Sequence, residues 1–127
     1  MPVYRDADRG IRLVRAVQTQ RLSSGTHVEV VIVDDGSDDG AADIMEKSIG
    51  EQVTLHRLPT NSGRAIARNA GAARATGELL LFMDSDCLPA DAGLIAAHLR
   101  RFQKDVVAST GPVVGIGRGF WHAFQVG

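Results

Sequence analysis

Residues 28–37 read Val-Glu-Val-Val-Ile-Val-Asp-Asp-Gly-Ser, and this stretch decides the class of fold. All but one of its first six residues are β-branched, which favours an extended backbone. The run is apolar without alternation, as is typical of a strand that is covered on both faces. It ends abruptly in residues that favour a tight turn. We therefore predict a buried strand over 28–33 that delivers Asp34 and Asp35 to the edge of a sheet.

Strands and helices are predicted to alternate on either side of this stretch. The periodicity and turn signals predict helices over 6–22, 41–49, 64–76 and 90–102. They predict the last step of a strand at 1–4, strands over 53–58 and 79–83, and a further apolar segment at 106–108. Ser37 or Asp38 is expected to cap the helix over 41–49, and Gly50 to end it. The many small residues of the helix over 64–76 suggest tight packing on the sheet. The alternation predicts an α/β fold with a mainly parallel sheet between two layers of helices.

The bulk composition limits the possible functions. A chain of 127 residues, 44% hydrophobic and 23% charged, is expected to fold as a single domain, 1–127. Its net charge of −1 argues against binding nucleic acid or an anionic membrane through a long-range field. No apolar run approaches the roughly 20 residues that span a bilayer. The single cysteine, Cys87, excludes an intramolecular disulfide, and a cytoplasmic location is expected.

Polar residues follow three of the predicted strands. In an open parallel sheet, ligands bind beyond the carboxyl ends of the strands. Asp34 and Asp35 follow one strand, Asp84 and Asp86 follow another, and the loop 60–64 follows a third. Each cluster alone is also a good turn or helix-cap sequence. Together, carboxylates at one rim are suitable ligands for Mg²⁺ or Mn²⁺, which bind one or two carboxylates with phosphate oxygens and water.

These residues carry a resemblance that covers roughly the first ninety positions. The segments are Pro2-Val3-Tyr4, Val33-Asp34-Asp35-Gly36-Ser37, Asn61-x-Gly63 with Ala67-Arg68-Asn69-Ala70-Gly71, and Gly77-Glu78 leading to Asp84-Ser85-Asp86. In order and spacing, the chain resembles the donor-binding half of family 2 glycosyltransferases with the GT-A fold. Each motif alone is weak, and the combination is specific. The resemblance implies a transferase that uses a nucleotide-diphospho-sugar, a UDP-sugar in the first instance, in the synthesis of cell-envelope polysaccharide.

The resemblance also implies roles for individual residues. Pro2, Val3 and Tyr4 would line the pocket for the base. Asp35 would accept the imide N–H of a uracil-like ring, because a carboxylate there pairs only with a donor.

The remaining implied roles concern the ribose, the two phosphates and the metal. Asp84 and Ser85 would face the ribose or the neighbouring phosphate. Asp86 would ligate a Mg²⁺ or Mn²⁺ ion that bridges the phosphates. Arg64 or Arg68 would add a guanidinium to the phosphate charge, although both positions are equally compatible with a solvated helix face.

The resemblance implies inversion at the sugar by direct displacement, with a carboxylate that removes the acceptor's proton. No residue of this chain is identified as that base, which is expected after Gly127, together with the acceptor-binding half. The strand before Pro2 is likewise expected to be cut short. Acceptor identity stays open, and any membrane association is expected through segments other than these.

Three other interpretations remain. A phosphoacceptor receiver domain has a similar length and an Asp after a hydrophobic strand, but its lysine should close the last strand, whereas Lys104 precedes the segment at 106–108. A haloacid-dehalogenase-type phosphatase would use Asp84 as nucleophile and Asp86 as acid, and would require Thr or Val at Leu88. A non-catalytic nucleotide-binding remnant of the glycosyltransferase fold is the third.

Overall fold

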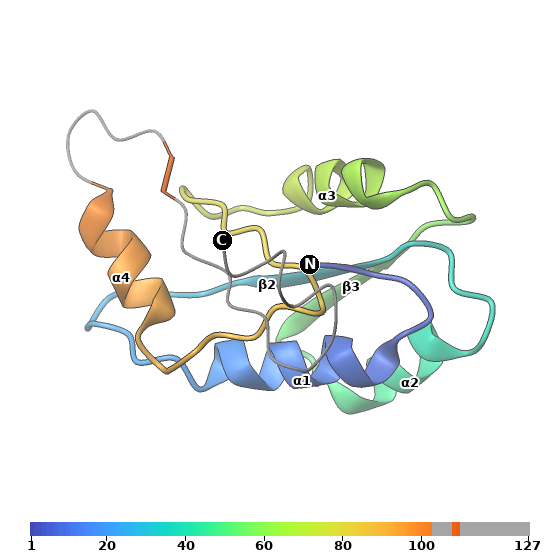
Figure 1. Cartoon of the computed structure of the whole chain (residues 1–127), viewed down its shortest axis with the longest axis horizontal. Helices are drawn as coiled ribbons and strands as arrows, with labels where there is room; N and C mark the ends of the chain where they lie inside the picture. The colour runs from blue at the N-terminus through green and yellow to red at the C-terminus, as the bar shows by residue number, and fades with distance from the viewer. Residues whose placement is uncertain (103–107, 110–127) are drawn as a thin grey trace, which may run out of the picture.

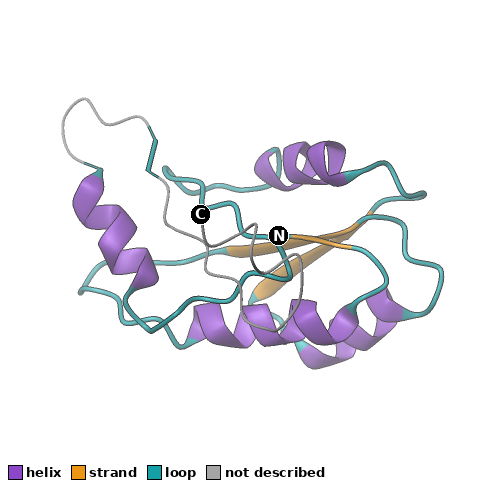
Figure 2. Cartoon of the chain, in the orientation of Figure 1, coloured by secondary structure: helices purple, strands orange, loops and turns teal. Residues whose placement is uncertain are grey.

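The sheet of the protein has three parallel strands. The structure is a computed structural model that describes residues 1–102, 108 and 109. Its strands are β1 (Pro2–Val3), β2 (Val30–Asp34) and β3 (Val53–Arg57), in the order β1-β2-β3 (Figure 2). Val33 lies opposite Pro2 on one side and His56 on the other. The apolar run at 28–33 therefore supplies most of the central strand, β2, as its lack of alternation predicts.

Helices cover both faces of this sheet. Helices α1 (Ala7–Gln18) and α2 (Ala41–Ser48) lie on one face, and α3 (Arg64–Ala72) lies on the other (Figure 1). Helix α4 (Leu94–Arg101) lies beyond one end of the sheet. The predicted α/β class with a parallel sheet between two helical layers is confirmed. No helix of the described residues is long and apolar enough to cross a membrane.

The two faces of β2 pack differently. Toward α1 and α2, the side chains of Leu13, Ile32 and Met45 are fully buried and form the centre of the core. Toward α3, Val33 meets Gly71, where an added Cβ would lie 3.2 Å from a methyl carbon of Val33. The predicted tight packing of the small residues of α3 on the sheet is confirmed.

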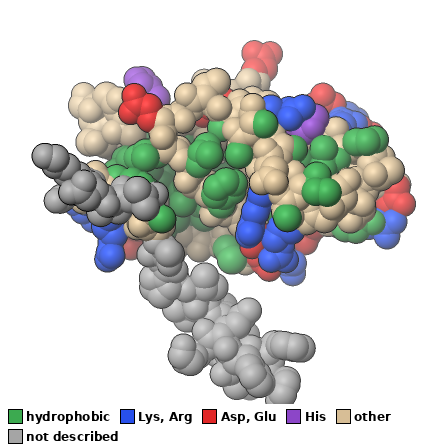
Figure 3. All heavy atoms as spheres, turned by 90° about the horizontal axis from the view of Figure 1, so that it is seen from above, with side chains coloured by type: hydrophobic (Ala, Val, Ile, Leu, Met, Phe, Trp, Pro, Cys, Tyr) green, Lys and Arg blue, Asp and Glu red, His purple; other side chains and the backbone are tan. Residues whose placement is uncertain are grey.

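The predicted strand over 79–83 is wrong. These residues form a loop, and no hydrogen bond joins their backbone to another part of the chain that the structure describes. A strand needs a neighbour with free N–H and C=O groups. The edges of the sheet are β1 and β3, and β1 has only two residues, of which Pro2 has no N–H. The side chains of Leu79 to Phe82 are consequently 42–50% exposed, and Figure 3, seen from the side of α3, shows hydrophobic side chains at the surface.

The remaining differences concern the ends of helices and strands; β2, for example, begins at Val30 and includes Asp34. The helices predicted over 6–22, 64–76 and 90–102 are all shorter than expected. At the end of α1, the Gln20 side chain instead binds the backbone of the 91–95 segment. The predicted cap of α2 is wrong, since its N-cap is Gly40 and Asp39 accepts from the Ala41 N–H. Gly50 has the expected left-handed backbone, with φ +74°. Lys104, Val106 and Val107 lie outside the described residues.

Candidate functional site

A cavity of about 340 Å³ opens beyond the carboxyl ends of β1 and β2. This volume lies in the range of small-molecule sites. The lining residues come from β1, four loops and the first turns of α1 and α3: Pro2, Val3, Tyr4, Asp6, Arg9, Asp35, Asn61, Gly63, Arg64, Asp84, Ser85 and Asp86. Eight of the residues that the sequence predicts for the site are among them, and Arg68, the alternative to Arg64, is not. The geometry therefore brings the predicted residues together, without testing the role that each was given.

The parallel sheet explains this convergence. Because β1 and β2 run in the same direction, Tyr4 and Asp35 follow neighbouring strand ends at one edge. The loop after β3 returns over the same edge, where α3 begins at Arg64. The loop with Asp84 to Asp86 completes the wall, although it does not follow a strand as predicted.

The two carboxylates at the end of β2, Asp34 and Asp35, bind different partners. Asp34 is 2% exposed, and its Oδ2 accepts from the Ser37 N–H at 3.2 Å, which fixes the turn. Asp35 is also buried, and its two oxygens accept from the backbone N–H groups of Ser62 and Gly63 at 2.8 and 2.9 Å. Charge-assisted bonds of this kind are short and strong. Asp35 thus holds the loop before α3 against the end of β2.

Two arginines of α3 neutralise Asp84. One nitrogen of Arg68, Nη2, donates to both carboxylate oxygens of Asp84, at 2.7 and 2.9 Å. Arg64 approaches the same carboxylate at 3.4 Å and keeps most of its side chain exposed. The two arginines are four residues apart on one helical face, which explains why they meet one partner. Arg68 is therefore occupied by Asp84, whereas Arg64 is available to a ligand in the cavity.

Asp86 lies at the exposed mouth of the cavity. The contact that the structure gives its carboxylate is a weak one, from Cys87 Sγ at 3.5 Å. Burial, followed by the hydrogen bond to Asp86 and the negative charge of that carboxylate, raises the pKa of the Cys87 thiol. Within the described ranges, no group of three or more His, Cys, Asp or Glu side chains is placed to hold a metal ion. Asp86, the predicted metal ligand, therefore has only this weak contact among the described residues.

Two lining residues, Asp6 and Arg9, lie outside every segment that the sequence singles out for the site, whereas Asn61 and Gly63 belong to one of its motifs. Asp6 caps α1 by accepting from the Arg9 N–H, and its second oxygen lies 3.3 Å from the Arg9 guanidinium. Their position at the start of the helix after β1 could have predicted them, because that helix begins at the carboxyl edge of the sheet. The lining therefore holds four carboxylates and two guanidinium groups. An anionic ligand would meet a net negative wall unless a cation came with it.

The chain is similar in sequence to known glycosyltransferases. The sequence model of the family described as Glycosyl transferase family 2 matches residues 1–126. An uncharacterized glycosyltransferase of Haemophilus influenzae is 40% identical over 88 residues, covering 68% of this chain and 34% of that protein. The undecaprenyl-phosphate 4-deoxy-4-formamido-L-arabinose transferase of Klebsiella pneumoniae is 32% identical over 89 residues, covering 68% and 27%. Succinoglycan biosynthesis protein ExoO of Rhizobium meliloti is 37% identical over 83 residues, covering 65% and 23%.

The alignments with these three relatives span about a quarter to a third of their lengths. The family model, in contrast, matches all of this chain except its last residue, Gly127. It includes every residue that lines the cavity. On this evidence the chain belongs to glycosyl transferase family 2.

Proposed function

We propose that the chain binds the nucleoside diphosphate part of a sugar donor, a UDP-sugar in the first instance, for transfer of the sugar to an acceptor. One observation carries the proposal: Tyr4, Asp35, Arg64 and Asp86 come from separate segments and line one cavity at the carboxyl edge of the parallel strands. Family membership supports the class of reaction. The cavity volume is suited to part of such a donor.

The base is assigned to the β1 side of the cavity. Pro2, Val3 and Tyr4 offer backbone groups and one aromatic ring there. Each Asp35 oxygen accepts one backbone N–H, so each keeps a further lone pair. A carboxylate in this state accepts the imide N–H of uracil, and it has no donor for the ring nitrogen of cytosine. This difference is the reason for preferring a uridine nucleotide.

The phosphates are assigned to the side of Arg64 and Asp86. Arg64 has one long contact to Asp84 and is otherwise free to donate to phosphate. Asp86 fits a Mg²⁺ or Mn²⁺ ion, because such ions take one or two carboxylates and fill their remaining positions with phosphate oxygens and water. A bound ion would lower the cost of the charge that develops on the departing nucleoside diphosphate. The cation would also reduce the electrostatic repulsion between the phosphates and the carboxylates that line the cavity.

The transfer is proposed to invert the configuration at the sugar. Direct displacement requires a base for the proton of the acceptor hydroxyl. We assign no described residue to that role. The contribution of these residues is to bind the donor and to hold the leaving group.

The acceptor is proposed to be a carbohydrate or lipid-linked carbohydrate of the cell envelope. One relative is named for succinoglycan biosynthesis, and another is named an undecaprenyl-phosphate 4-deoxy-4-formamido-L-arabinose transferase. A polyprenyl phosphate acceptor would place the reaction at the inner face of a membrane. A cytoplasmic location at that face is part of the proposal.

Thermal unfolding with ligands tests the donor site. UDP with Mn²⁺ is expected to raise the Tm, because a ligand at 100 times its Kd stabilises the folded state by about 2.7 kcal/mol. The Asp86→Ala variant should lose the Mn²⁺-dependent part of this increase and keep its unliganded Tm. The matched control is Glu51→Ala, which removes an exposed carboxylate that does not line the cavity.

The same assay separates the alternatives. A Tm that responds to UDP and Mn²⁺ equally in the wild type and in Asp86→Ala would contradict the metal assignment. A chain that responds to no nucleotide, but is stabilised by beryllofluoride with Mg²⁺, would contradict the transferase proposal and favour a phosphoacceptor domain.

A further inference from the structure

Arg5 has a backbone conformation that L-residues rarely adopt. Its φ is +50°, and it is the one residue other than glycine with positive φ in the described part of the chain. The Cβ atom makes this region unfavourable. Such an outlier persists when neighbouring contacts hold it, and it often marks a functional position.

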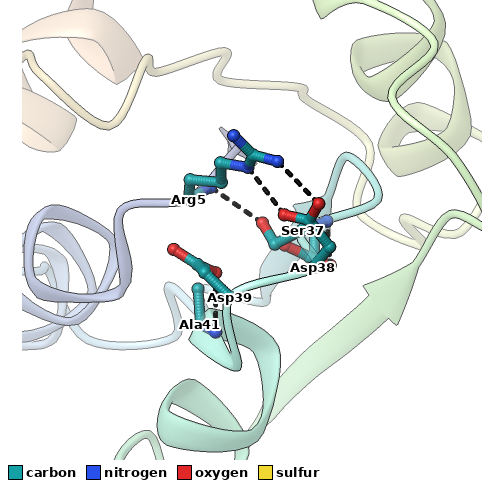
Figure 4. A network of polar contacts seen from close by, with 6 residues as sticks. Arg5, Ser37, Asp38, Asp39 and Ala41 are labelled. Atoms are coloured by element: carbon teal, nitrogen blue, oxygen red, sulfur yellow. Dashed lines mark hydrogen bonds and ion pairs between the residues drawn. The ribbon is translucent and has the colours of Figure 1, made fainter.

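Three hydrogen bonds hold Arg5, and all of them reach the turn after β2 (Figure 4). Its backbone N–H donates to Ser37 Oγ at 2.8 Å. Its Nε and Nη2 atoms donate to the two oxygens of Asp38, at 2.7 and 2.6 Å. A two-pronged pair of this kind fixes orientation as well as distance. We name these residues, Arg5, Ser37 and Asp38, the Arg5 clasp.

The clasp joins the two turns that carry the base side of the cavity. Tyr4, directly before Arg5, and Asp35, two residues before Ser37, both line the cavity. The guanidinium carbon of Arg5 also lies 5.2 Å from the centre of the Tyr4 ring, within cation–π distance. The ring is otherwise exposed, since 41% of the Tyr4 surface is accessible. The guanidinium therefore limits the positions that this ring can take.

A stabilising role for the fold alone does not account for this arrangement. The side chains of Arg5 and Asp38 are 50% and 67% exposed, and ion pairs at such exposure add little to stability. The contacts also maintain an unfavourable backbone. They do fix two cavity walls relative to each other, and fixing a site in its bound form strengthens ligand binding.

We propose that Arg5 is a positioning residue of the nucleotide site, which acts through Tyr4 and through the turn after β2 to keep the base pocket formed before the ligand arrives. The inference rests on the proposed nucleotide-binding function. Arg5 does not itself line the cavity. Substitution of Arg5 should therefore weaken binding of the base and leave binding of the phosphates unchanged.

The Arg5→Gly variant tests this role. Glycine accepts the left-handed backbone and keeps the N–H that donates to Ser37, while it removes the two side-chain bonds to Asp38 and the contact with Tyr4, so the Tm should stay the same or rise. The affinity for UDP with Mn²⁺, measured by titration calorimetry on the purified chain, should fall by about threefold to tenfold. The affinity for inorganic pyrophosphate with Mn²⁺ should not change. A merely structural role would move the two affinities together.

Two further variants make the test specific. Arg5→Gly should have no additional effect on UDP affinity in a Tyr4→Ala, Asp38→Ala background, where both partners of the Arg5 side chain are already removed. Arg57→Ala is the matched control, because Arg57 also forms a surface ion pair with two carboxylates, Asp43 and Glu46, and does not line the cavity. It should leave UDP affinity unchanged.

Equal UDP affinity of the wild type and Arg5→Gly would overturn the inference and leave the proposed function intact. A parallel loss of UDP and pyrophosphate affinity would overturn it as well. A wild-type chain that binds neither UDP nor pyrophosphate would instead overturn the proposed function, and this inference with it.

Discussion

Gly36 lies where the turn after β2 passes closest to the loop after β3. Its φ is +71°, and a Cβ added to it would lie 2.3 Å from the Thr60 carbonyl carbon and 2.5 Å from the Asn61 nitrogen. Both are backbone atoms, so neither can move aside as a flexible side chain would. The close approach is what allows the neighbouring Asp35 to reach two N–H groups of the 60–63 loop.

We predict that Gly36→Ala destabilises the protein more than Gly40→Ala does. Both positions have left-handed backbones, which cost an L-residue about 1–2 kcal/mol. At Gly40 a Cβ would meet nothing within 4 Å, whereas at Gly36 it clashes with backbone. Overpacking should add about 1–3 kcal/mol to the loss at Gly36. Urea unfolding of the two variants measures the difference, and equal losses would show that the two loops do not approach each other in this way.

At this scale, the sequence predicted which residues gather but not how they bond. Asp35 and Asp84 were placed at the rim because they follow apolar runs. Their partners were not predictable, since Asp35 binds backbone N–H groups 27 and 28 residues away and Asp84 binds Arg68 16 residues away. Distances between loops depend on the whole sheet, which local patterns do not encode.

At the scale of elements, two apolar runs of similar composition have different fates. Residues 28–33 and 79–83 both predict buried strands. The first supplies most of β2, which has a neighbour on each side. The second has no such neighbour in the described part of the chain. Composition indicates that a segment favours an extended backbone, but a strand also requires a partner whose hydrogen-bonding groups are free.

Hydrogen exchange should separate these two segments. Backbone amides of β2, such as Val33, whose N–H donates to the Met1 carbonyl at 2.9 Å, should exchange only when the protein unfolds globally. The amides of Leu79 to Phe82 should exchange at least about a hundredfold faster, because no hydrogen bond within the described residues protects them. Mass spectrometry of short peptic peptides covers both segments. Comparable protection in 79–82 would mean that these amides have strand-like partners.

At the scale of the whole molecule, the sheet connects the cavity at its carboxyl edge to contacts at its opposite edge. The cavity uses the carboxyl edge, while side chains at the far side join distant segments. Glu29 accepts from the Thr76 backbone and hydroxyl, at 2.8 and 3.0 Å. Gln20 binds the 91–95 segment. Because these contacts join distant segments, the three layers are expected to unfold together. A group that titrates on any strand can therefore change the free energy of unfolding of the whole domain.

His56 on β3 is such a group. Burial lowers its pKa below the ordinary value of 6.5, and the positive charge of Arg74 adds to this effect. Between the folded and unfolded pKa values, the unfolded chain binds more protons than the folded one, so the free energy of unfolding rises with pH. The stability linked to neutral His56 is complete above 6.5 and is lost as the pH falls through the lower, folded pKa. In His56→Gln this pH dependence should disappear, with little change at about pH 7.5. Urea unfolding of both proteins at about pH 7.5 and pH 5.5 measures it. If the wild type and His56→Gln lost stability equally between these pH values, another group would be responsible.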